Sequence, residues 1–485
     1  MSDQPAAENN PPGLRLRVRM YRPGLGDCFL LSFFTQGVER HVLIDCGVYQ
    51  GTPDSEKRMR EIVRHIRRAT NGRLDLVVVT HEHWDHLSGF IQAQGLFDLI
   101  SIGEIWMAWT EDPTHPLANE LREERSTALQ TLNTALGFLP AGVGSQGAMV
   151  RAVLDFFGAP LGAAKVSGAR QALDYLAGRQ DARISYCQPG EAPRALEGLP
   201  QVRFFVLGPP LSEKLLKKTL PTKKGKEGYG LFQELTLMGS FSAALDRLSA
   251  GLLDTAAQVE NFPFDPSFRI PVEVARQEPF FLEHYGFEDQ PGHGESWRRI
   301  DRDWLGVASD LALQLDSATN NTSLVLAIEL VESGQVLLFP GDAQVGSWLS
   351  WEGLSWDLPA PDGSPKALKA HDLLKCISLY KVGHHGSHNA TLRLKGLELM
   401  ESPQLAAMIP VDREMVDRQG WNMPFPLLFT RLQEKTRGRL IRLDEGLPHQ
   451  PPLTESGLPW LASTEWKAFL KRSRQERLYI DYLLE

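Results

Sequence analysis

A long apolar strand that ends in a histidine-rich hexapeptide constrains this chain more than any other feature of its sequence. Residues 74–80, LDLVVVT, are mostly apolar and rich in β-branched side chains, which is typical of a strand buried on both faces. The hexapeptide HEHWDH follows directly, over residues 81–86. A sheet that is covered on both faces needs a layer on each side, so the sequence predicts a layered α/β fold.

The hexapeptide has the composition of a metal site. Histidines at positions i, i+2 and i+5 and an aspartate at i+4 cannot all face one side of a strand or a helix, so we expect an inward-folding loop. Imidazoles and carboxylates are the usual protein ligands of catalytic zinc, which keeps one position open for water. Three of the 13 histidines fall within six residues after a buried strand, which argues against a chance surface cluster. The candidate ligands are His81, His83, Asp85 and His86.

Hydrophobic patterning places other elements around this loop. Residues 14–21 alternate apolar and basic side chains, a Gly-containing turn follows, and residues 28–34 resume as a strand, which predicts a hairpin. Residues 41–46 form a third strand, and residues 56–69 have the apolar spacing of an amphipathic surface helix. The expected organisation is a disordered leader over 1–13, a core over 14–110 and 316–445, a mainly helical insertion with some core strands over 111–315, and a C-terminal extension over 446–485.

Composition narrows the class of protein. Lys and Arg number 51 and Asp and Glu 60, so the formal net charge of −9 excludes a polycation that holds nucleic acid through bulk charge. The four cysteines show no CxxC spacing, which argues against a disulfide scaffold and a thiolate zinc site. No apolar run reaches the roughly 18 residues of a membrane span, and the first residues are polar. We therefore expect a cytoplasmic protein with no membrane partner.

Two later segments also end apolar strands on polar side chains. QVLLFPGDA places Asp342 directly after a strand and a glycine, where a carboxylate reaches a site built at strand tips. KVGHHGSHNAT, over residues 381–391, opens a strand onto a histidine-rich tip. Taken alone, Asp342 is also compatible with an ordinary turn aspartate.

The pattern HxHxDH at residues 81–86 resembles the metallo-β-lactamase fold hydrolases. The resemblance narrows to the hydrolase domain of ComEC-type competence proteins, because GLGDCFLL, HVLIDCG, NNTSLVL, FPGDA and KVGHHGSHNAT occur in that order. These motifs cover about residues 14–110 and 316–412. The resemblance implies an αββα sandwich, two mixed sheets back to back with helices outside, and a dimetal site at the strand tips.

The resemblance also implies a set of ligands for two divalent ions, Zn²⁺ or alternatively Mn²⁺. By that correspondence His81 and His83 hold the first ion, and Asp85, His86 and His384 hold the second. Asp342 bridges the two ions. Asp45 is expected to be a buried partner that orients the metal loop rather than a ligand.

One departure from the wider superfamily concerns the first ion. Many members donate a further histidine from a loop before the GD strand, where this chain has Asn320, Asn321, Thr322 and Ser323. Asn321 and Ser323 could instead position a phosphate or a water, although Asn-Asn before a strand is also good turn chemistry. His115 could replace the missing ligand, but a surface position is the commoner explanation for such a histidine.

The adjacent histidines of KVGHHGS are expected to differ in role. His384 directly follows the strand and its glycine and is assigned to the metal, while His385 is assigned to the substrate as a proton donor or phosphate contact. The order of the two could be reversed. The catalytic candidates are Asp85, Asp342 and His385, and the further substrate or supporting groups on this loop are Ser387, His388, Asn389 and Thr391.

The expected reaction is hydrolysis by a metal-bound hydroxide. A phosphodiesterase or nuclease is the first choice, with a phosphodiester or nucleic acid as substrate. A small-molecule ester, lactone or thioester hydrolase is the alternative, since fold does not settle substrate. A third possibility is a sensing or partner-binding module whose insertion contacts a protein. The six lysines between Lys214 and Lys226 form either a solvated loop or a local positive funnel for a polyanion.

Overall fold

The computed structural model describes residues 13–137, 145–159, 167–219, 270–284, 303–359, 365–454 and 456–485. The leader expected over residues 1–13 lies outside these ranges except for Gly13. None of the helices in the described ranges combines the length and the apolar character that crossing a membrane requires.

The first sheet has eight strands and contains the predicted hairpin. β1 and β2 pair antiparallel, with Arg15 opposite Phe34 and Met20 opposite Phe29. β3, β4, β5 and β6 continue in parallel. In spatial order the strands are β16 (Ser473–Gln475), β17 (Tyr479–Leu484), β1 (Arg15–Tyr21), β2 (Cys28–Thr35), β3 (Val38–Cys46), β4 (Arg73–Val78), β5 (Ser101–Ala108) and β6 (Arg183–Cys187).

The second sheet has seven strands and is also mixed. Its strands β10, β13, β14 and β15 run parallel, and β9 and β8 are antiparallel to their neighbours. In spatial order they are β15 (Leu440–Arg442), β14 (Ala406–Ile409), β13 (Ile377–Lys381), β10 (Gln335–Phe339), β9 (Val325–Leu330), β8 (Leu199–Gly208) and β7 (Arg194–Leu196). A separate two-stranded sheet pairs β11 (Ser355–Pro359) with β12 (Pro365–Lys369).

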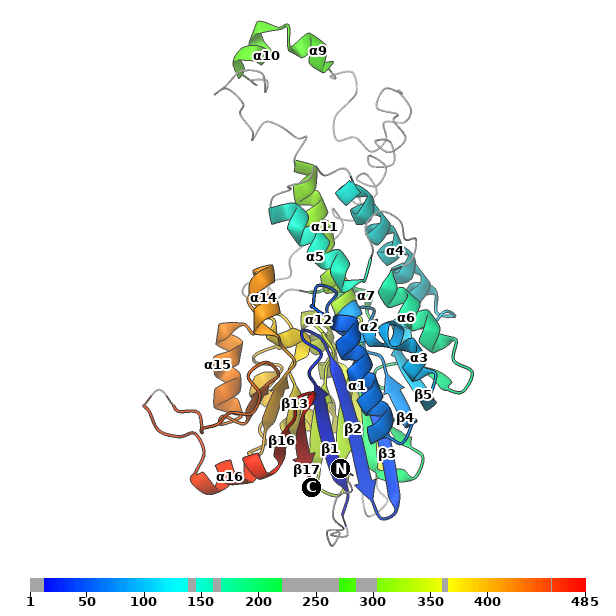
Figure 1. Ribbon diagram of the computed structural model, residues 1–485, viewed down its shortest axis with the longest axis vertical. Coiled ribbons are helices and arrows are strands. Elements are labelled where there is room, and N and C mark those ends of the chain that lie inside the picture. Colours follow the sequence, from blue (N-terminus) through cyan, green and yellow to red (C-terminus); the bar gives the residue numbers. More distant parts are fainter. Residues whose placement is uncertain are drawn as a thin grey trace.

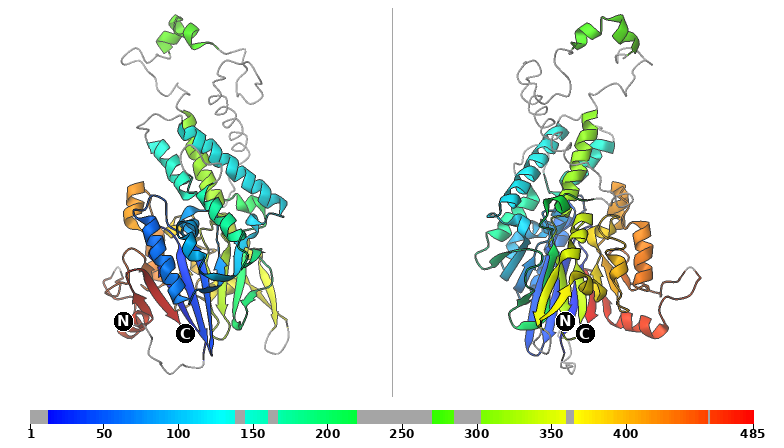
Figure 2. Two further views of the ribbon diagram at one scale, coloured as in Figure 1. Left: turned by 45° about the vertical axis from the view of Figure 1, so that its right-hand side comes forward. Right: turned by 180° about the vertical axis from the view of Figure 1, so that it is seen from behind.

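The two sheets pack face to face around one apolar layer. The rings of Phe29 and Phe339, one from each sheet, meet edge to face at 5.5 Å, and Trp106 meets Phe204 at 5.4 Å. Helices cover both outer faces (Figures 1 and 2). The expected αββα sandwich is therefore confirmed.

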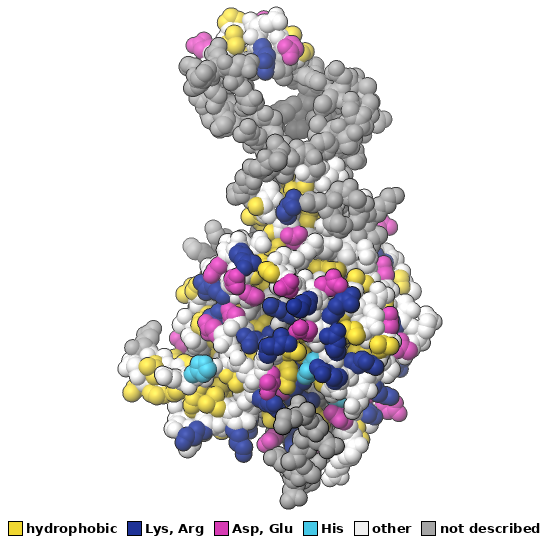
Figure 3. Space-filling view, in the orientation of Figure 1, with side chains coloured by type: hydrophobic (Ala, Val, Ile, Leu, Met, Phe, Trp, Pro, Cys, Tyr) yellow, Lys and Arg dark blue, Asp and Glu magenta, His cyan; other side chains and the backbone are white. Residues whose placement is uncertain are grey.

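The helices on each outer face follow from their apolar spacing. In α1 (Ser55–Ala69) the side chains of Met59, Ile62, Val63 and Ile66 are buried, which confirms the predicted amphipathic helix. Its opposite face is rich in Lys and Arg mixed with acids, as Figure 3 shows near the middle of that view. With α1, the first sheet carries α2 (Trp84–Gln92), α3 (Gln94–Phe97) and α6 (Gly168–Ala177), and the second carries α12 (Val345–Ser350), α13 (Ala370–Lys375), α14 (Arg413–Gln419) and α15 (Pro426–Lys435).

Three helices of the expected insertion stand on one end of the sandwich (Figure 1). They are α4 (Pro116–Gly137), α5 (Ser145–Phe156) and α11 (Asp303–Asn320), and they pack on one another through one apolar cluster. The same stretch of sequence contributes β6, β7 and β8 to the sheets. Its remaining described helices are short: α7 (Glu213–Leu216), α9 (Val272–Ala275) and α10 (Pro279–His284).

The last strands differ from the expected C-terminal extension. β17 lies between β16 and β1 within the first sheet, so residues 479–484 are part of the core. The preceding helix, α16 (Ser463–Lys471), places Trp466 and Phe469 in the layer between the sheets. A local sequence pattern could not show that this strand is inserted beside β1.

Candidate metal centre

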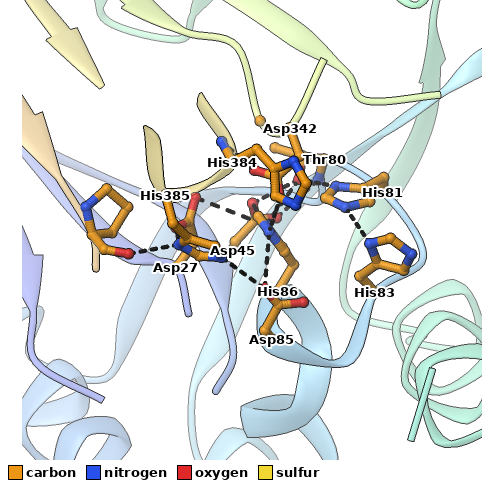
Figure 4. A network of polar contacts seen from close by, with 12 residues as sticks. Asp27, Asp45, Thr80, His81, His83, Asp85, His86, Asp342, His384 and His385 are labelled. Carbon is orange, nitrogen blue, oxygen red and sulfur yellow. Dashed lines mark hydrogen bonds and ion pairs between the residues drawn. The ribbon is translucent and has the colours of Figure 1, made fainter. Parts of the chain in front are cut away.

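The predicted metal loop lies where four strands end. β3 and β4 of the first sheet and β10 and β13 of the second all end at this edge, and each is followed by polar residues that converge (Figure 4). These side chains are almost fully buried, since the exposed fraction is 0–3% for all of them except His384, at 9%. Burial of so many polar groups requires partners for each, and a bound cation is one such partner.

Four side chains form a compact group that fits one ion. Ligand atoms of Asp85, His86, Asp342 and His385 all lie within 4.8 Å of one another. Nε2 of His385 lies 3.0 Å from Oδ2 of Asp85, and Nε2 of His86 lies 3.2 Å from Oδ2 of Asp342. Two imidazoles and two carboxylates are a suitable donor set for a divalent ion.

The hydrogen bonds of Nδ1 in His385 and His86 determine which nitrogen of each ring can bind an ion. Nδ1 of His385 lies 2.6 Å from the carbonyl of Pro410, which can only accept, so this nitrogen donates, and in the neutral ring the lone pair is on Nε2. Nδ1 of His86 donates in the same way to Oδ2 of Asp45 at 2.7 Å. Such hydrogen bonds to the far ring nitrogen commonly orient metal-binding histidines.

The structure brings His385, and not His384, to this group. Both residues have left-handed backbone conformations, with φ of 46° and 52°, which are uncommon outside glycine and cluster at functional sites. This turn directs His385 toward Asp85, whereas the backbone N–H of His384 donates to Oδ1 of Asp342 at 3.0 Å. Nδ1 of His384 is buried and has no hydrogen-bond partner. The geometry thus favours the reverse of the expected order.

His81 and His83 form a second pair beside the group. Nε2 of His81 and Nδ1 of His83 face each other at 3.0 Å, close enough for both to bind one ion, because Zn–N bonds are about 2.0–2.1 Å. Nδ1 of His81 lies 3.0 Å from the Thr80 hydroxyl and 3.3 Å from that of Ser323. Burial lowers the pKa of His83 to about 3 and that of His81 well below its usual value, so both rings are neutral, as ligands must be.

Asp45 holds the metal loop from behind. Its Oδ1 accepts from the backbone N–H of Thr80 at 2.8 Å, and its Oδ2 accepts from the Thr80 hydroxyl at 2.7 Å and from His86. Asp45 also has a left-handed backbone, with φ of 54°. Its contacts are those of an orienting group rather than of a ligand.

The carboxylates shape the charge of the centre. Burial opposes ionisation of Asp342, but His86 and Lys381 outweigh it and hold the pKa of Asp342 well below its usual value. Burial likewise opposes charging of His86, but Asp342, Asp85 and neighbouring carboxylates raise the pKa of His86 well above the usual value. An excess of negative charge therefore surrounds His86, which is the environment that attracts a cation.

Sequence analysis gave no role to Asp27 and Lys381, which form an ion pair beside the centre. The Lys381 ammonium also donates to the carbonyl of Gly341 at 3.0 Å and lies 3.4 Å from Oδ1 of Asp342. Burial alone would lower the pKa of Lys381. The negative charges of Asp27 and Asp342 more than offset burial and raise this pKa above its usual value, so the ammonium stays charged. The sequence does contain a signal for this pair, since Asp27 belongs to the GLGD motif and Lys381 to the KVGHHG motif.

A further acid reaches the metal loop from the helical layer, and no local pattern could have indicated it. Oδ1 of Asp316, in α11, lies 3.8 Å from Nε2 of His83. Burial and the charges of Asp85 and Asp342 raise the pKa of Asp316 to about 8; cations at the centre would offset that repulsion and favour the carboxylate.

Glu82, within the hexapeptide, forms a buried ion pair with Arg125 of α4. Arg170 of α6 lies 3.6 Å from the same carboxylate, and Glu111 accepts from Arg170 at 3.0 Å. Beside the metal loop, Glu82, Glu111 and Arg125 of this network are buried, and Arg170 is partly exposed. Breaking a buried pair by removing one partner is strongly destabilising, so the network fixes the loop against the helices.

The residues expected to contact substrate mostly bind the protein itself. Oδ1 of Asn321 accepts from two backbone N–H groups, and its Nδ2 donates to the carbonyls of Leu215 and Leu216 at 2.8 and 2.7 Å. The Ser323 hydroxyl donates to the Asn320 carbonyl and accepts from the Asp342 N–H at 3.0 Å. A substrate role for Asn321 or Ser323 stays a prediction, and their contacts are structural.

The other polar residues of the 381–391 loop vary in exposure. The Ser387 hydroxyl donates to Asn389 at 3.0 Å, and Thr391 pairs with the Tyr380 hydroxyl at 2.7 Å. His388 is exposed, with its ring 6.0 Å from that of Phe425. Outside this loop, His115 packs against Trp109 at 4.7 Å.

Aromatic side chains close the side of the centre next to His83. The ring of Phe157 meets that of His83 edge to face at 4.7 Å, and Phe156 lies 5.7 Å from it. Phe156 stacks on Trp421 at 5.2 Å and contacts Tyr49 at 4.9 Å. The wall is apolar, so it excludes water from that side and strengthens electrostatic interactions within the centre.

The fit to metal rests on atoms that the protein leaves unsatisfied. Within the described residues, the buried polar atoms of the centre that lack a hydrogen-bond partner include Asp85 Oδ1, His384 Nδ1 and Asp27 Oδ1. Such atoms are rare in folded proteins and call for a specific explanation, of which a bound ion is one. The centre can therefore accept divalent ions.

Comparison with known proteins agrees with this geometry. The family model described as Metallo-beta-lactamase superfamily matches residues 21–110, a stretch that contains Asp27, Asp45 and the HEHWDH loop. No curated protein matches the chain. That superfamily consists mostly of metal-dependent hydrolases, and the buried His/Asp group supplies the ligands that such chemistry uses.

Proposed function

We propose that this chain is a phosphodiesterase that works with two divalent metal ions, Zn²⁺ or alternatively Mn²⁺. The observation that carries the proposal is the buried group of Asp85, His86, Asp342 and His385 next to the facing nitrogens of His81 and His83. The four-residue group suits one ion, and the adjacent His81–His83 pair suits a second. In this proposal Asp342 is shared by the two ions. The metal-dependent hydrolases of the matched superfamily supply the precedent.

In this proposal each ion has a defined set of ligands. His81 Nε2 and His83 Nδ1 would hold the first ion, and Asp342 would contribute a carboxylate to both ions. The ligands of the second ion are then Asp85, His86 and His385, which replaces the assignment of His384 expected from sequence. When bound, two such ions lower the pKa of a water nucleophile and neutralise charge on the reacting oxygens.

The chain's own residues prepare the site for that chemistry. Lys381 and the N–H of His384 engage Oδ1 of Asp342, which directs Oδ2 toward His86. The hydrogen bonds of Asp45 and Pro410 hold Nδ1 of His86 and of His385, so Nε2 of each ring faces a carboxylate of the proposed ligand group. Positions that are fixed before substrate arrives need no reorganisation during the reaction.

The choice of a phosphodiester rests on the lysine-rich segment. Its first part is anchored at the centre, because the Lys218 carbonyl accepts from Gly346 N–H at 2.8 Å and from Asn321, and the Thr219 carbonyl accepts from Asn389 at 3.4 Å. A run of lysines that begins there would attract an anionic substrate. Lys223, Lys224 and Lys226 lie outside the described residues. The similarity of the sequence motifs to ComEC-type proteins supports the same choice, including nucleic acid as substrate.

A small-molecule ester, lactone or thioester hydrolase is the second candidate. The observation that favours it is the aromatic wall of Phe156 and Phe157 beside His83, which suits an apolar acyl group. A sensing or partner-binding role for the helical layer is a third proposal, and it has no comparable support from the described residues.

One experiment separates these proposals. The purified chain is loaded with Zn²⁺ or Mn²⁺ and assayed on bis-p-nitrophenyl phosphate, single- and double-stranded oligonucleotides, and a panel of esters and lactones. We expect phosphodiester cleavage, and we expect chelation of the metal to abolish it. The variant His385→Ala should lose this activity. The control variant His371→Ala should keep it, because His371 is exposed on α13. Cleavage of esters or lactones alone would favour the second candidate. Absence of bound metal would contradict both hydrolase proposals.

A further inference from the structure

The first ion of the proposed centre has few ligands from the chain, and α11 approaches it from outside. The loop before β9 carries Asn320 to Ser323 in place of a histidine, and the two asparagine side chains are buried. Asp316 lies four residues before the end of α11, on the side that faces His83. Among the described acids of α4, α5 and α11, Asp316 is the one that contacts the His81–His83 pair.

The two nitrogens of His83 face different groups. Nδ1 lies 3.0 Å from His81 Nε2, whereas Nε2 lies 3.8 Å from Asp316 Oδ1. The nitrogens are on separate edges of one imidazole ring, so an ion shared by His81 and His83 Nδ1 lies on the far side from Asp316. Asp316 is therefore placed to face the N–H of His83 and not the ion.

Both atoms lack any other hydrogen-bond partner. His83 Nε2 and Asp316 Oδ1 are buried, and within the described residues neither makes a hydrogen bond. The second carboxylate oxygen of Asp316 is held by Asn320 Nδ2 at 3.1 Å. The rings of Phe156 and Phe157 pack on His83 and offer it no acceptor. If His83 Nε2 and Asp316 Oδ1 moved about 1 Å closer together, they would form an ordinary N–H···O hydrogen bond.

We propose that Asp316 is a positioning residue of the first metal site, which accepts the Nε2 proton of His83 and so directs the Nδ1 lone pair to the ion. The inference rests on the proposed two-ion centre and adds a residue to it. Carboxylates in this position fix the tautomer and the ring angle of a metal-binding histidine and raise its basicity. Because α11 packs on α4 and α5, the helical layer then contributes directly to metal affinity.

The test is a metal titration of the full chain without substrate. Asp316→Ala and Asp316→Asn are compared with Asp310→Ala, which changes an exposed acid on the same helix. Co²⁺ serves as the probe, because its absorption spectrum reports the ligands of each ion as the two sites fill. We expect Asp316→Ala to weaken the first ion by about 10- to 100-fold, as for other groups that support metal ligands, and to leave the second ion and the Asp310→Ala control unchanged.

The asparagine variant distinguishes positioning from direct ligation. Its amide oxygen can still accept from His83, so we expect an affinity for the first ion between those of the wild type and Asp316→Ala. If Asp316→Ala does not fold, a measurable weakening of the first ion in Asp316→Asn supports the proposal, and an unchanged affinity overturns it. Equal losses in the two folded variants would make Asp316 a ligand and would also overturn it. A wild type that binds two ions but cleaves no phosphodiester would refute the proposed function alone.

Discussion

Gly47 offers the sharpest test of how tightly the centre depends on its backbone, because a substitution there removes no polar group. A Cβ at this position would lie 2.3 Å from the carbonyl carbon of Asp85, and 2.4 Å from both the Asp85 oxygen and the His86 nitrogen. These atoms form the peptide that carries two proposed ligands. In Gly47→Ala the metal loop must move by about 1 Å to restore an ordinary contact of about 3.5 Å.

The size of the effect follows from that displacement. Overpacking of a well-packed interior costs about 1–3 kcal/mol, which is roughly 5- to 150-fold in affinity if the ion-bound state bears the cost. A misplacement of about 1 Å in an active site can lower turnover by about 100-fold. The loop has little freedom to adjust, because the Asp85 carbonyl accepts from the N–H of Asp27 at 3.0 Å and the N–H of Gly47 donates to the Asp27 carbonyl at 2.9 Å.

The assay measures metal content, the affinity of each ion and phosphodiester turnover in Gly47→Ala and in a control. Gly95→Ala is the matched control, because it lies in α3 with nothing within 4 Å of its would-be Cβ. We expect Gly95→Ala to keep metal and turnover, with a gain in stability of up to about 1 kcal/mol from helix propensity. If Gly47→Ala bound both ions with wild-type affinity and turned over normally, the inferred coupling between this glycine and the loop would be wrong.

Three further results are expected. His385→Ala should lose the second ion while His384→Ala retains it, by elemental analysis; equal losses would refute the division. Nearby carboxylates raise the pKa of His86 well above its usual value, so an ion that takes the place of the His86 proton should release it, and the metal affinity should rise as pH rises toward that pKa; calorimetric heats that do not depend on the buffer would contradict this. Replacing Lys217 and Lys218 with Gln should weaken oligonucleotide binding and lower its salt slope by about 0.7 per lost phosphate contact on single strands, while cleavage of bis-p-nitrophenyl phosphate stays unchanged; an unaltered salt response would make the segment a solvated surface.

Local patterning predicted the elements whose own residues determine them. The strand before HEHWDH, the hairpin of β1 and β2 and the buried stripe of α1 are all present, because alternation and helical spacing are properties of adjacent residues. The convergence of His81, Asp85 and Asp342 was also foreseeable, since strand ends of the two sheets meet at one edge. The family resemblance supplied the arrangement of those sheets.

Features that depend on distant segments were not predictable. Asp316 is 233 residues from His83, and nothing in its own surroundings marks it as a partner of the metal loop. The order of His384 and His385 depends on two successive left-handed residues, which no property of the pair itself indicates. Helix and strand patterns describe which face a residue occupies but not which remote group meets it.

The pairing of β17 with β1 bears on how the chain assembles while it is being made. Arg19 of β1 donates to both carboxylate oxygens of Asp481 at 2.7 Å, in a buried ion pair that spans 462 residues. Between the end of β1 and the start of β17 lie residues 22–478, which number 457, and their synthesis takes about 20–90 s at about 5–20 residues per second. Throughout that interval one edge of β1 has exposed N–H and C=O groups that could pair with another nascent chain. The first sheet is therefore completed only after β17 has been synthesised, so a chaperone that shields β1 until then should raise the yield of folded protein.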